Sequence, residues 1–168
     1  MKCFICGQDM ACSPETYHYK ECGLDNVFLE NVEVCRCDSC NEKIACIPTL
    51  PKLNNVIGEG LLRKKSMLNG KEIRFLRKNM GLKGVELQKY LGVDNATISR
   101  WEQAKQKISP GNDRLLRVVY AHVKGVPHET ITSLVKDLFA QIRPKELATK
   151  PYKIDFSKWS NGCLLSAT

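Results

Sequence analysis

The sequence predicts an α+β chain in which a small antiparallel β module, stapled by cysteines, is followed by an all-α domain of five helices. Three observations support this prediction. Eight of the nine cysteines lie in residues 1–46. Strand-like runs occur in the same segment, whereas helical periodicity of apolar residues begins near residue 69. The net charge also changes sign, from −4 over residues 1–46 to +10 over residues 47–128.

Length and composition restrict the class of protein. The 168 residues, of which 26% are charged, suit one or two small globular domains and exclude a large catalytic barrel. No apolar run approaches the roughly 18 residues needed to cross a membrane. Residues 1–7 also lack the apolar core of a secretory signal. We therefore expect a cytoplasmic protein with no membrane partner.

Four cysteines have the spacing of metal ligands. Cys3 and Cys6 form one C-x2-C pair, and Cys37 and Cys40 form a second. Four thiolates suit tetrahedral zinc, and a closed four-sulfur site is structural because it leaves no open position for water. Gly7 and Asn41 follow the two pairs, and both residue types tolerate the left-handed backbone of a tight turn. The alternative, a redox dithiol in one pair, is weakened because neither pair lies in a βαβ pattern.

The remaining cysteines of this segment are Cys12, Cys22, Cys35 and Cys46. Their spacings match no metal motif, so small buried thiols are the favoured interpretation. A second metal site that also uses His18 is the alternative. Cys35 could also replace Cys37 in the first site, because Cys35-Arg36-Cys37 offers both thiols.

Two runs in this segment have strand composition, Tyr17 to Tyr19 and Val27 to Val34. In the second run Val27 and Leu29 share one parity, whereas Val32 and Val34 have the other. A bulge or turn near Glu30 and Asn31 would restore a common apolar face. We expect a small antiparallel sheet with zinc holding its ends together. Residues 53–68 then mix glycines, leucines and basic residues, and the pattern fits either a flexible linker or a short interrupted helix.

A series of short helices follows. Residues 71–80 place Ile73, Leu76 and Met80 on one face, and Gly81 ends that helix. A second helix over residues 84–91 buries Leu87 and Leu91 and ends at Gly92. Val93 turns inward and Asp94 is placed as the N-cap of a third helix over residues 95–104. That third helix directs Ile98 and Trp101 into the core.

The second and third helices form a helix-turn-helix unit. The exposed side chains of the third helix are of types that read base edges, since Asn pairs with adenine, Arg pairs with guanine, and methyl groups contact thymine. These candidates are Asn95, Ala96, Thr97, Ser99, Arg100 and Gln103. Surrounding cations would contact phosphates, among them Arg74, Arg77, Lys78, Lys89, Lys105 and Lys107. A merely solvated charged face is the alternative, and the excess of ten positive charges argues against it.

Three more predictions concern the segment after the third helix. Glu102 is expected to accept backbone N–H bonds from the following loop rather than to act in catalysis. Pro110 ends that loop and Asn112 caps a fourth helix, whose apolar residues are Leu115, Leu116, Val119 and Val123. His122 lies on this helix, at the surface or in an interface, rather than as a ligand.

A fifth helix is predicted over residues 129–142, where Ile131, Leu134, Val135, Leu138, Phe139 and Ile142 form one apolar stripe. The stripe completes the core or forms a dimer interface, and the pattern does not decide between them. Beyond Pro144, Tyr152, Ile154 and Phe156 alternate with polar residues as in a strand. This tail, with Trp159, could dock on its own domain, exchange with a second protomer, or bind a partner's sheet edge.

The second half of the chain resembles the Xre-type helix-turn-helix family. The matching residues are Leu82, Glu86, Leu87, the run Leu91-Gly92-Val93, and the run Thr97 to Glu102. Together with Cys3, Cys6, Cys37 and Cys40 ahead of it, the order of modules over residues 1–142 resembles the MqsA-type antitoxins. Three positions depart from the family pattern. Lys83 and Gly84 stand where Ser or Thr and then Gln are usual, and Gln88 replaces Ala. The lost Gln is a common phosphate anchor, and Lys83 could replace it.

The resemblance implies a homodimer that binds a palindromic operator in double-stranded DNA, represses its own operon, and binds a toxin protein through its zinc module. The corresponding boundaries are 1–46 for the zinc module, 47–68 for the linker, 69–142 for the DNA-binding domain and 143–168 for an extension of no assigned role. A stand-alone regulator without a toxin is the alternative. A zinc- or thiol-dependent enzyme is the remote one, since the sequence offers neither an open metal site nor a nucleophile with its base.

Overall fold

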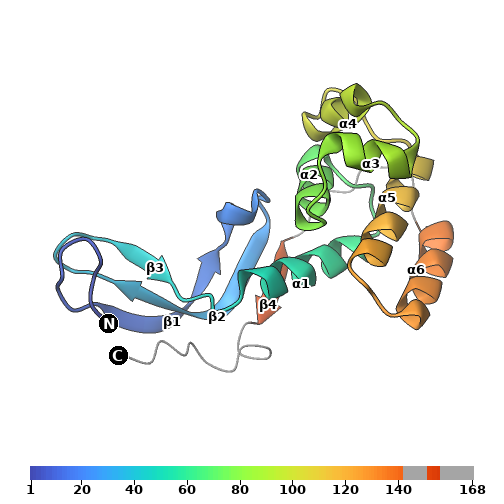
Figure 1. Ribbon diagram of the computed structural model, residues 1–168. Coiled ribbons are helices and arrows are strands. Elements are labelled where there is room, and N and C mark those ends of the chain that lie inside the picture. The colour runs from blue at the N-terminus through green and yellow to red at the C-terminus, as the bar shows by residue number, and fades with distance from the viewer. Residues whose placement is uncertain (142–150, 156–168) are drawn as a thin grey trace. The chain divides into compact units, whose positions relative to one another are not determined.

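The computed structural model describes residues 1–141 and 151–155, which belong to two compact units. The sheet unit contains residues 1–21 and 25–50 together with the strand at 152–155, and the helical unit contains residues 22–24 and 51–141. Figure 1 shows a small sheet in the first and a set of helices in the second. This confirms the α+β fold class. Among the described residues, no helix is both long enough and apolar enough to cross a membrane.

The sheet unit is built around its longest strand, β2 (Val27–Arg36). β2 pairs antiparallel with β1 (Ala11–His18) on one side and with β3 (Lys43–Ala45) on the other. A 3₁₀ turn, η1 (Lys20–Cys22), follows β1. The sheet thereby supplies a rigid frame on which the amino-terminal turn and the loop after β2 can meet.

The predicted bulge lies in β2. Glu15 pairs with Val32 and Tyr17 pairs with Leu29, so β2 contains one more residue than β1 between these pairs. Glu30 and Asn31 of β2 thus lie opposite the single residue Thr16 of β1, and Asn31 has a positive φ of 58°. Because the bulge reverses the side-chain parity, Val27, Leu29, Val32 and Val34 are all buried, each with no more than 1% of its surface exposed.

The fourth strand comes from a distant part of the chain. β4 (Tyr152–Asp155) pairs parallel with residues 27–30 of β2, and Ile154 is buried. Lys153 forms an ion pair with Glu30 at 3.1 Å, and Asn31 donates a hydrogen bond to Asp155 at 3.2 Å. Three docking modes were expected for this tail. In the structure, β4 docks on β2 of the same chain. Phe156 and Trp159 lie outside the described residues.

The helical unit begins earlier than residue 69. Helix α1 (Leu50–Leu62) occupies most of the segment 47–68. Of the two interpretations of this segment, a flexible linker or a short helix, the structure has the helix. The reason is its apolar face, since Leu53, Ile57, Leu61 and Leu62 are all buried. Gly58 lets α1 approach the following helices closely, because a Cβ at this position would lie 1.9 Å from the Tyr120 hydroxyl.

The next three helices follow the predicted order. They are α2 (Gly70–Asn79), α3 (Gly84–Leu91) and α4 (Asn95–Glu102), and both α2 and α3 pack against α4. Ile73, Leu76, Leu87 and Leu91 are buried as expected. Asn69 caps α2 reciprocally with Glu72. Gly70 is required at the contact with α4, where a Cβ would meet the Trp101 carbonyl oxygen at 2.4 Å.

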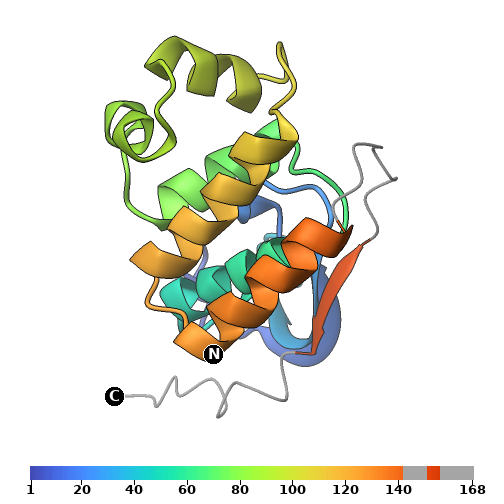
Figure 2. The ribbon, with the colours of Figure 1, turned by 90° about the vertical axis from the view of Figure 1, so that its right-hand side faces the viewer.

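The last two helices are α5 (Pro110–Val123) and α6 (His128–Gln141), which pack against each other (Figure 2). The predicted cap of α5 was wrong. Ser109 is the N-cap, its hydroxyl accepts from the Asn112 N–H at 3.3 Å, and Pro110 fills the first helical position. Leu116 and Val119 are buried, Val123 is half-buried and Leu115 is exposed. His122 lies at the surface.

On α6, Ile131 and Val135 are half-buried. The side chains of Leu134, Leu138, Phe139 and Ile142 lie outside the described residues, so the choice between core and dimer interface stays a prediction.

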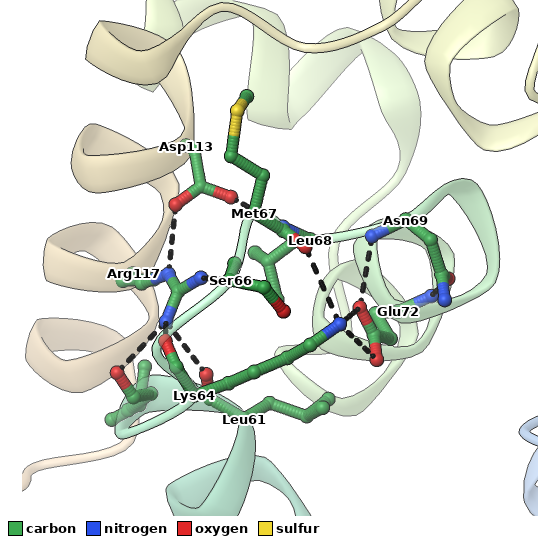
Figure 3. A network of polar contacts seen from close by, with 10 residues as sticks. Leu61, Lys64, Ser66, Met67, Leu68, Asn69, Glu72, Asp113 and Arg117 are labelled. Carbon is green, nitrogen blue, oxygen red and sulfur yellow. Dashed lines mark hydrogen bonds and ion pairs between the residues drawn. The ribbon is translucent and has the colours of Figure 1, made fainter. Parts of the chain in front are cut away.

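A buried polar network fixes the loop between α1 and α2 to α5 (Figure 3). Arg117 and Asp113 are fully buried and form an ion pair at 2.9 Å. Arg117 also donates to four carbonyl oxygens, at distances of 2.7–3.0 Å, which belong to Leu61, Leu62, Lys64 and Ser66. Asp113 accepts from the Leu68 N–H at 2.7 Å. Lys64 forms an ion pair with Glu72 at 2.8 Å, so the network extends to the start of α2.

Candidate metal centre and nucleic-acid interface

The four predicted metal ligands come together at one end of the sheet unit. The sulfur atoms of Cys3, Cys6, Cys37 and Cys40 all lie within 4.8 Å of one another. The two pairs sit in turns of the same form. The Gly7 N–H donates to the Cys3 carbonyl at 2.9 Å, and the Asn41 N–H donates to the Cys37 carbonyl at 2.8 Å.

The left-handed backbone expected after each pair is present, since φ is 73° at Gly7 and 59° at Asn41.

The geometry of these sulfurs fits a tetrahedral ion. Sulfurs about 2.3 Å from a central zinc ion would be about 3.8 Å apart. The Cys3–Cys40 and Cys6–Cys37 sulfur distances are 3.5 and 3.4 Å. A backbone hydrogen bond from Cys40, followed in strength by the Cys6 thiol, lowers the pKa of Cys37 to about 7. A backbone hydrogen bond from Glu42 lowers the pKa of Cys40, but desolvation and the neighbouring thiols outweigh it and raise that pKa to about 12. The fit to a metal therefore rests on the four thiols and their spacing.

The other cysteines correct two expectations. Cys12 and Cys35 face each other across β1 and β2 and form a disulfide, so they are not small buried thiols. Cys35 therefore does not replace Cys37 in the cluster. Cys46 is buried beside Cys3 and Cys37.

His18 stacks on Phe28 and bonds to the Asp25 carbonyl. Within residues 1–141 and 151–155, Cys3, Cys6, Cys37 and Cys40 are the one group with metal-site spacing.

The helix-turn-helix unit has the predicted backbone. Gly92 ends α3 in the left-handed conformation, with φ of 63°, and Asp94 occupies the N-cap position of α4. Ile98 and Trp101 are buried with 1% and 3% of their surfaces exposed. The opposite face of α4 carries the predicted base-reading side chains. Asn95, Ala96, Arg100 and Gln103 are exposed, and Thr97 and Ser99 are half-buried.

Two of the three departures from the family pattern, Gly84 and Gln88, lie against Asn95. The Gln88 side chain accepts a hydrogen bond from the Asn95 N–H at 3.2 Å. Gly84 leaves room for the Asn95 side chain, because a Cβ there would lie 2.0 Å from its Oδ1 atom. Gly84 and Gln88 thus fix the start of α4 against α3. The sequence pattern marked these residues as unusual but did not indicate their common neighbour.

Glu102 and Arg77 form a pair that the sequence analysis missed. Arg77 donates to both carboxylate oxygens of Glu102, at 2.6 and 2.9 Å, and to the Leu82 carbonyl. Hydrogen bonding to Glu102 raises the pKa of Arg77. The expectation that Glu102 accepts loop N–H groups was wrong, because the half-buried guanidinium of Arg77 provides a better-matched bidentate donor. Arg77 ties α2 to the end of α4 through this pair, and its phosphate contact stays a prediction.

Unlike Arg77, which is half-buried, other predicted phosphate-binding cations are exposed. Lys83, Lys89 and Lys105 are exposed, as are Arg74 and Lys78. Glu86 accepts from the Lys83 backbone N–H at 2.5 Å, so the Lys83 side chain stands at the amino-terminal end of α3. Lys105 follows α4 directly. The cations and the polar face of α4 therefore belong to the same helix-turn-helix unit.

Comparison with known families identifies this unit independently. The helix-turn-helix family (HTH_3) matches residues 73–116, which run from α2 into α5. No curated protein and no solved structure matches the chain. Residues 73–116 are thus similar to a helix-turn-helix domain, and this similarity suggests a DNA-binding regulator.

Proposed function

We propose that this protein binds DNA sequence-specifically through α4 and represses transcription. The observation that carries the proposal is that α4 has one buried face and one exposed polar face. This helix lies within the segment that matches the helix-turn-helix family. Ile98 and Trp101 anchor it. Asn95 and Ala96 in its first turn and Arg100 in its last turn remain exposed. A recognition helix reads bases with this part of its surface. Thr97, Ser99 and Gln103 extend the base-reading face.

The phosphate contacts are assigned to Lys83, Lys89 and Lys105, which are exposed around this face. Arg77 is assigned a positioning role instead, because both carboxylate oxygens of Glu102 occupy its guanidinium. Two copies of the chain would place two recognition helices about 34 Å apart. The proposed operator is therefore a palindrome bound by a homodimer.

The experiment selects binding sites from random double-stranded DNA and then compares variants on the selected site. Arg100→Ala is expected to lower specific affinity about 5- to 150-fold, while binding to random DNA changes little. Lys89→Ala is the matched control. It should weaken binding to both DNAs alike and reduce the salt slope by about one. Equal losses on both DNAs in Arg100→Ala would remove the base-reading role.

We also propose that the cysteine cluster holds a structural zinc ion. Four sulfurs with tetrahedral spacing support zinc, and the sheet unit has too small a core to depend on apolar burial alone. Metal analysis of the purified protein tests the identity of the ion. One zinc per chain is expected, and a protein that folds normally without metal would refute the proposal.

The finer role that we propose is that of an antitoxin, in which the acidic sheet unit binds a toxin protein. This rests on the resemblance in cysteine spacing and module order and on the net charge of −4 over residues 1–46. Affinity purification of the tagged protein from its native cells is the test. A stoichiometric small partner encoded by the adjacent gene is expected. Recovery of the homodimer with DNA alone would favour a stand-alone regulator.

A further inference from the structure

The turn between Cys3 and Cys6 carries the two most exposed large apolar side chains of the described residues. Phe4 and Ile5, called the apolar tip below, have 83% and 71% of their surfaces exposed. A single exposed apolar residue is normal on a protein surface, whereas adjacent ones mark a site of interaction. The apolar tip is therefore a candidate contact site of the sheet unit.

Folding does not require apolar side chains in such a turn. The second turn of the cysteine cluster, residues 37–40, has the same form and the same hydrogen bond from the residue that follows it to its first cysteine. At the positions equivalent to Phe4 and Ile5 it carries Asp38 and Ser39, which are exposed. The chain thus builds one of its two turns with polar residues. The apolar tip also takes no part in the buried cluster around the cysteines.

Backbone hydrogen bonds hold the apolar tip in one conformation. The Cys3 N–H donates to the Gln8 carbonyl at 2.8 Å, and the Gly7 N–H donates to the Cys3 carbonyl at 2.9 Å. The Met10 N–H donates to the Met1 carbonyl at 2.9 Å, so the chain on both sides of the turn is paired. A rigid element loses little conformational entropy when it binds, and this favours the turn as a contact site.

The charge around the apolar tip indicates the kind of partner. Residues 1–46 have a net charge of −4, and Asp38 is exposed on the other turn of the same cysteine cluster. Anionic membranes repel an acidic surface, which argues against a bilayer. A protein surface with Lys or Arg residues around an apolar pocket complements both the apolar side chains and the negative charge.

We propose that Phe4 and Ile5 insert into an apolar pocket of a partner protein, whose rim presents Lys or Arg to Asp38. The inference rests on the partner-binding role proposed above for the sheet unit, and it specifies the residues and the partner surface that this role uses. A few central anchors in a pocket carry most of the binding energy of an interface. The apolar tip lies outside residues 73–116, so partner binding and DNA binding use different residues.

Photo-crosslinking in native cells tests the contact directly. The full chain carries benzoylphenylalanine in place of Phe4 or, as a control, in place of Lys20, which is exposed in the same unit. Mass spectrometry of the cross-linked product identifies the partner and the linked peptide. The expected product comes from position 4 alone, and its linked peptide combines apolar residues with Lys or Arg.

Titration of the purified partner then measures the contribution of the apolar tip. Phe4→Asp/Ile5→Ser copies the sequence of the second turn, so it should keep the fold, as circular dichroism and metal content check. It should weaken partner binding about 30-fold or more, although its added negative charge suits a basic partner. Asp38→Asn should weaken binding only about 2- to 5-fold. Leu115→Ser, which removes an exposed apolar side chain of the helical unit, is the matched control and should change nothing.

The outcomes separate this inference from the proposed function. A partner that binds Phe4→Asp/Ile5→Ser as tightly as the wild type would refute the inference, while the partner-binding role of the sheet unit would stand. Recovery of no protein partner by the wild type would refute both. Cross-links between two copies of the chain would reveal a different occupant and refute the inference. Binding to phosphatidylglycerol vesicles that the double variant loses would do the same.

Discussion

Replacement of Arg117 by methionine removes the hydrogen-bond donor of several buried acceptors at once. The guanidinium is fully buried, forms an ion pair with Asp113, and donates to four carbonyl oxygens of residues 61–66. Removing one partner of a buried ion pair costs about 3–5 kcal/mol. Each buried acceptor left without a donor adds about 1–3 kcal/mol. We expect Arg117→Met to lower the free energy of unfolding of the helical unit by at least about 5 kcal/mol.

The double variant Asp113→Leu/Arg117→Met distinguishes the two parts of this loss. Where a buried ion pair acts alone, its replacement by apolar residues is often neutral or stabilising. Here the carbonyl oxygens of Leu62, Lys64 and Ser66 lose the Arg117 donor, and the Leu68 N–H loses its acceptor. The Leu61 carbonyl still accepts from the Lys64 N–H at 3.3 Å. We therefore expect the double variant to remain at least about 3 kcal/mol less stable than the wild type.

Urea unfolding followed by far-ultraviolet circular dichroism measures these differences. A small domain has only about 5–15 kcal/mol of stability, so Arg117→Met itself can lie below the range of the assay. Arg117→Lys, which keeps the charge but loses the planar fork, then supplies a measurable loss of about 2–3 kcal/mol. Recovery of the double variant to within about 1 kcal/mol of the wild type would refute the carbonyl-binding argument, because only the ion pair would then matter.

Three further predictions concern the site. Glu102→Gln should lower the free energy of unfolding by about 1.5–3 kcal/mol by weakening the bonds to Arg77, and a urea midpoint equal to that of the wild type would contradict it. In a chain that carries Asn95→Ala, Gly84→Ala should raise the free energy of unfolding by about 0.4–1 kcal/mol. In the wild type the gain should be smaller, because the Asn95 side chain must move away from the new methyl group. A double-mutant cycle without coupling between the two positions would disprove that contact. Cys37→Ser should lose the bound zinc and unfold the sheet unit while operator binding persists, as metal analysis and DNA titration would detect.

Local sequence signals predicted most of the fold. Each depends on residues within one or two turns of chain, such as the parity change in β2, the left-handed positions at Gly7 and Asn41, and the glycine that ends α3 at residue 92. The four cysteines at the candidate metal centre were found for the same reason, because C-x2-C is a local motif. The cap of α5 was predicted wrongly at Asn112, although a serine directly before a proline is a typical helix start and the local sequence Ser109-Pro110 indicates the cap.

Contacts between distant residues could not be predicted in this way. The Cys12–Cys35 disulfide depends on the register between β1 and β2, which the bulge also shifts. Arg77 looked like one more surface cation, and only the packing of α2 against α4 brings Glu102 to it. Arg117 likewise appears in the sequence as one of many basic residues. Its burial follows from the path of the chain between α1 and α2, which composition alone does not reveal.

The parallel strand β4 has a consequence for the order in which the protein is made. Residues 27–30 leave the ribosome long before residues 152–155, which pair with them. At about 5–20 residues per second, the delay is roughly 6–25 s. During that interval all of the helical segments emerge and can fold, while one edge of β2 has no partner strand there. Completion of the sheet is therefore a late step of synthesis, and the newly made chain exposes an open strand edge until residue 155 has emerged.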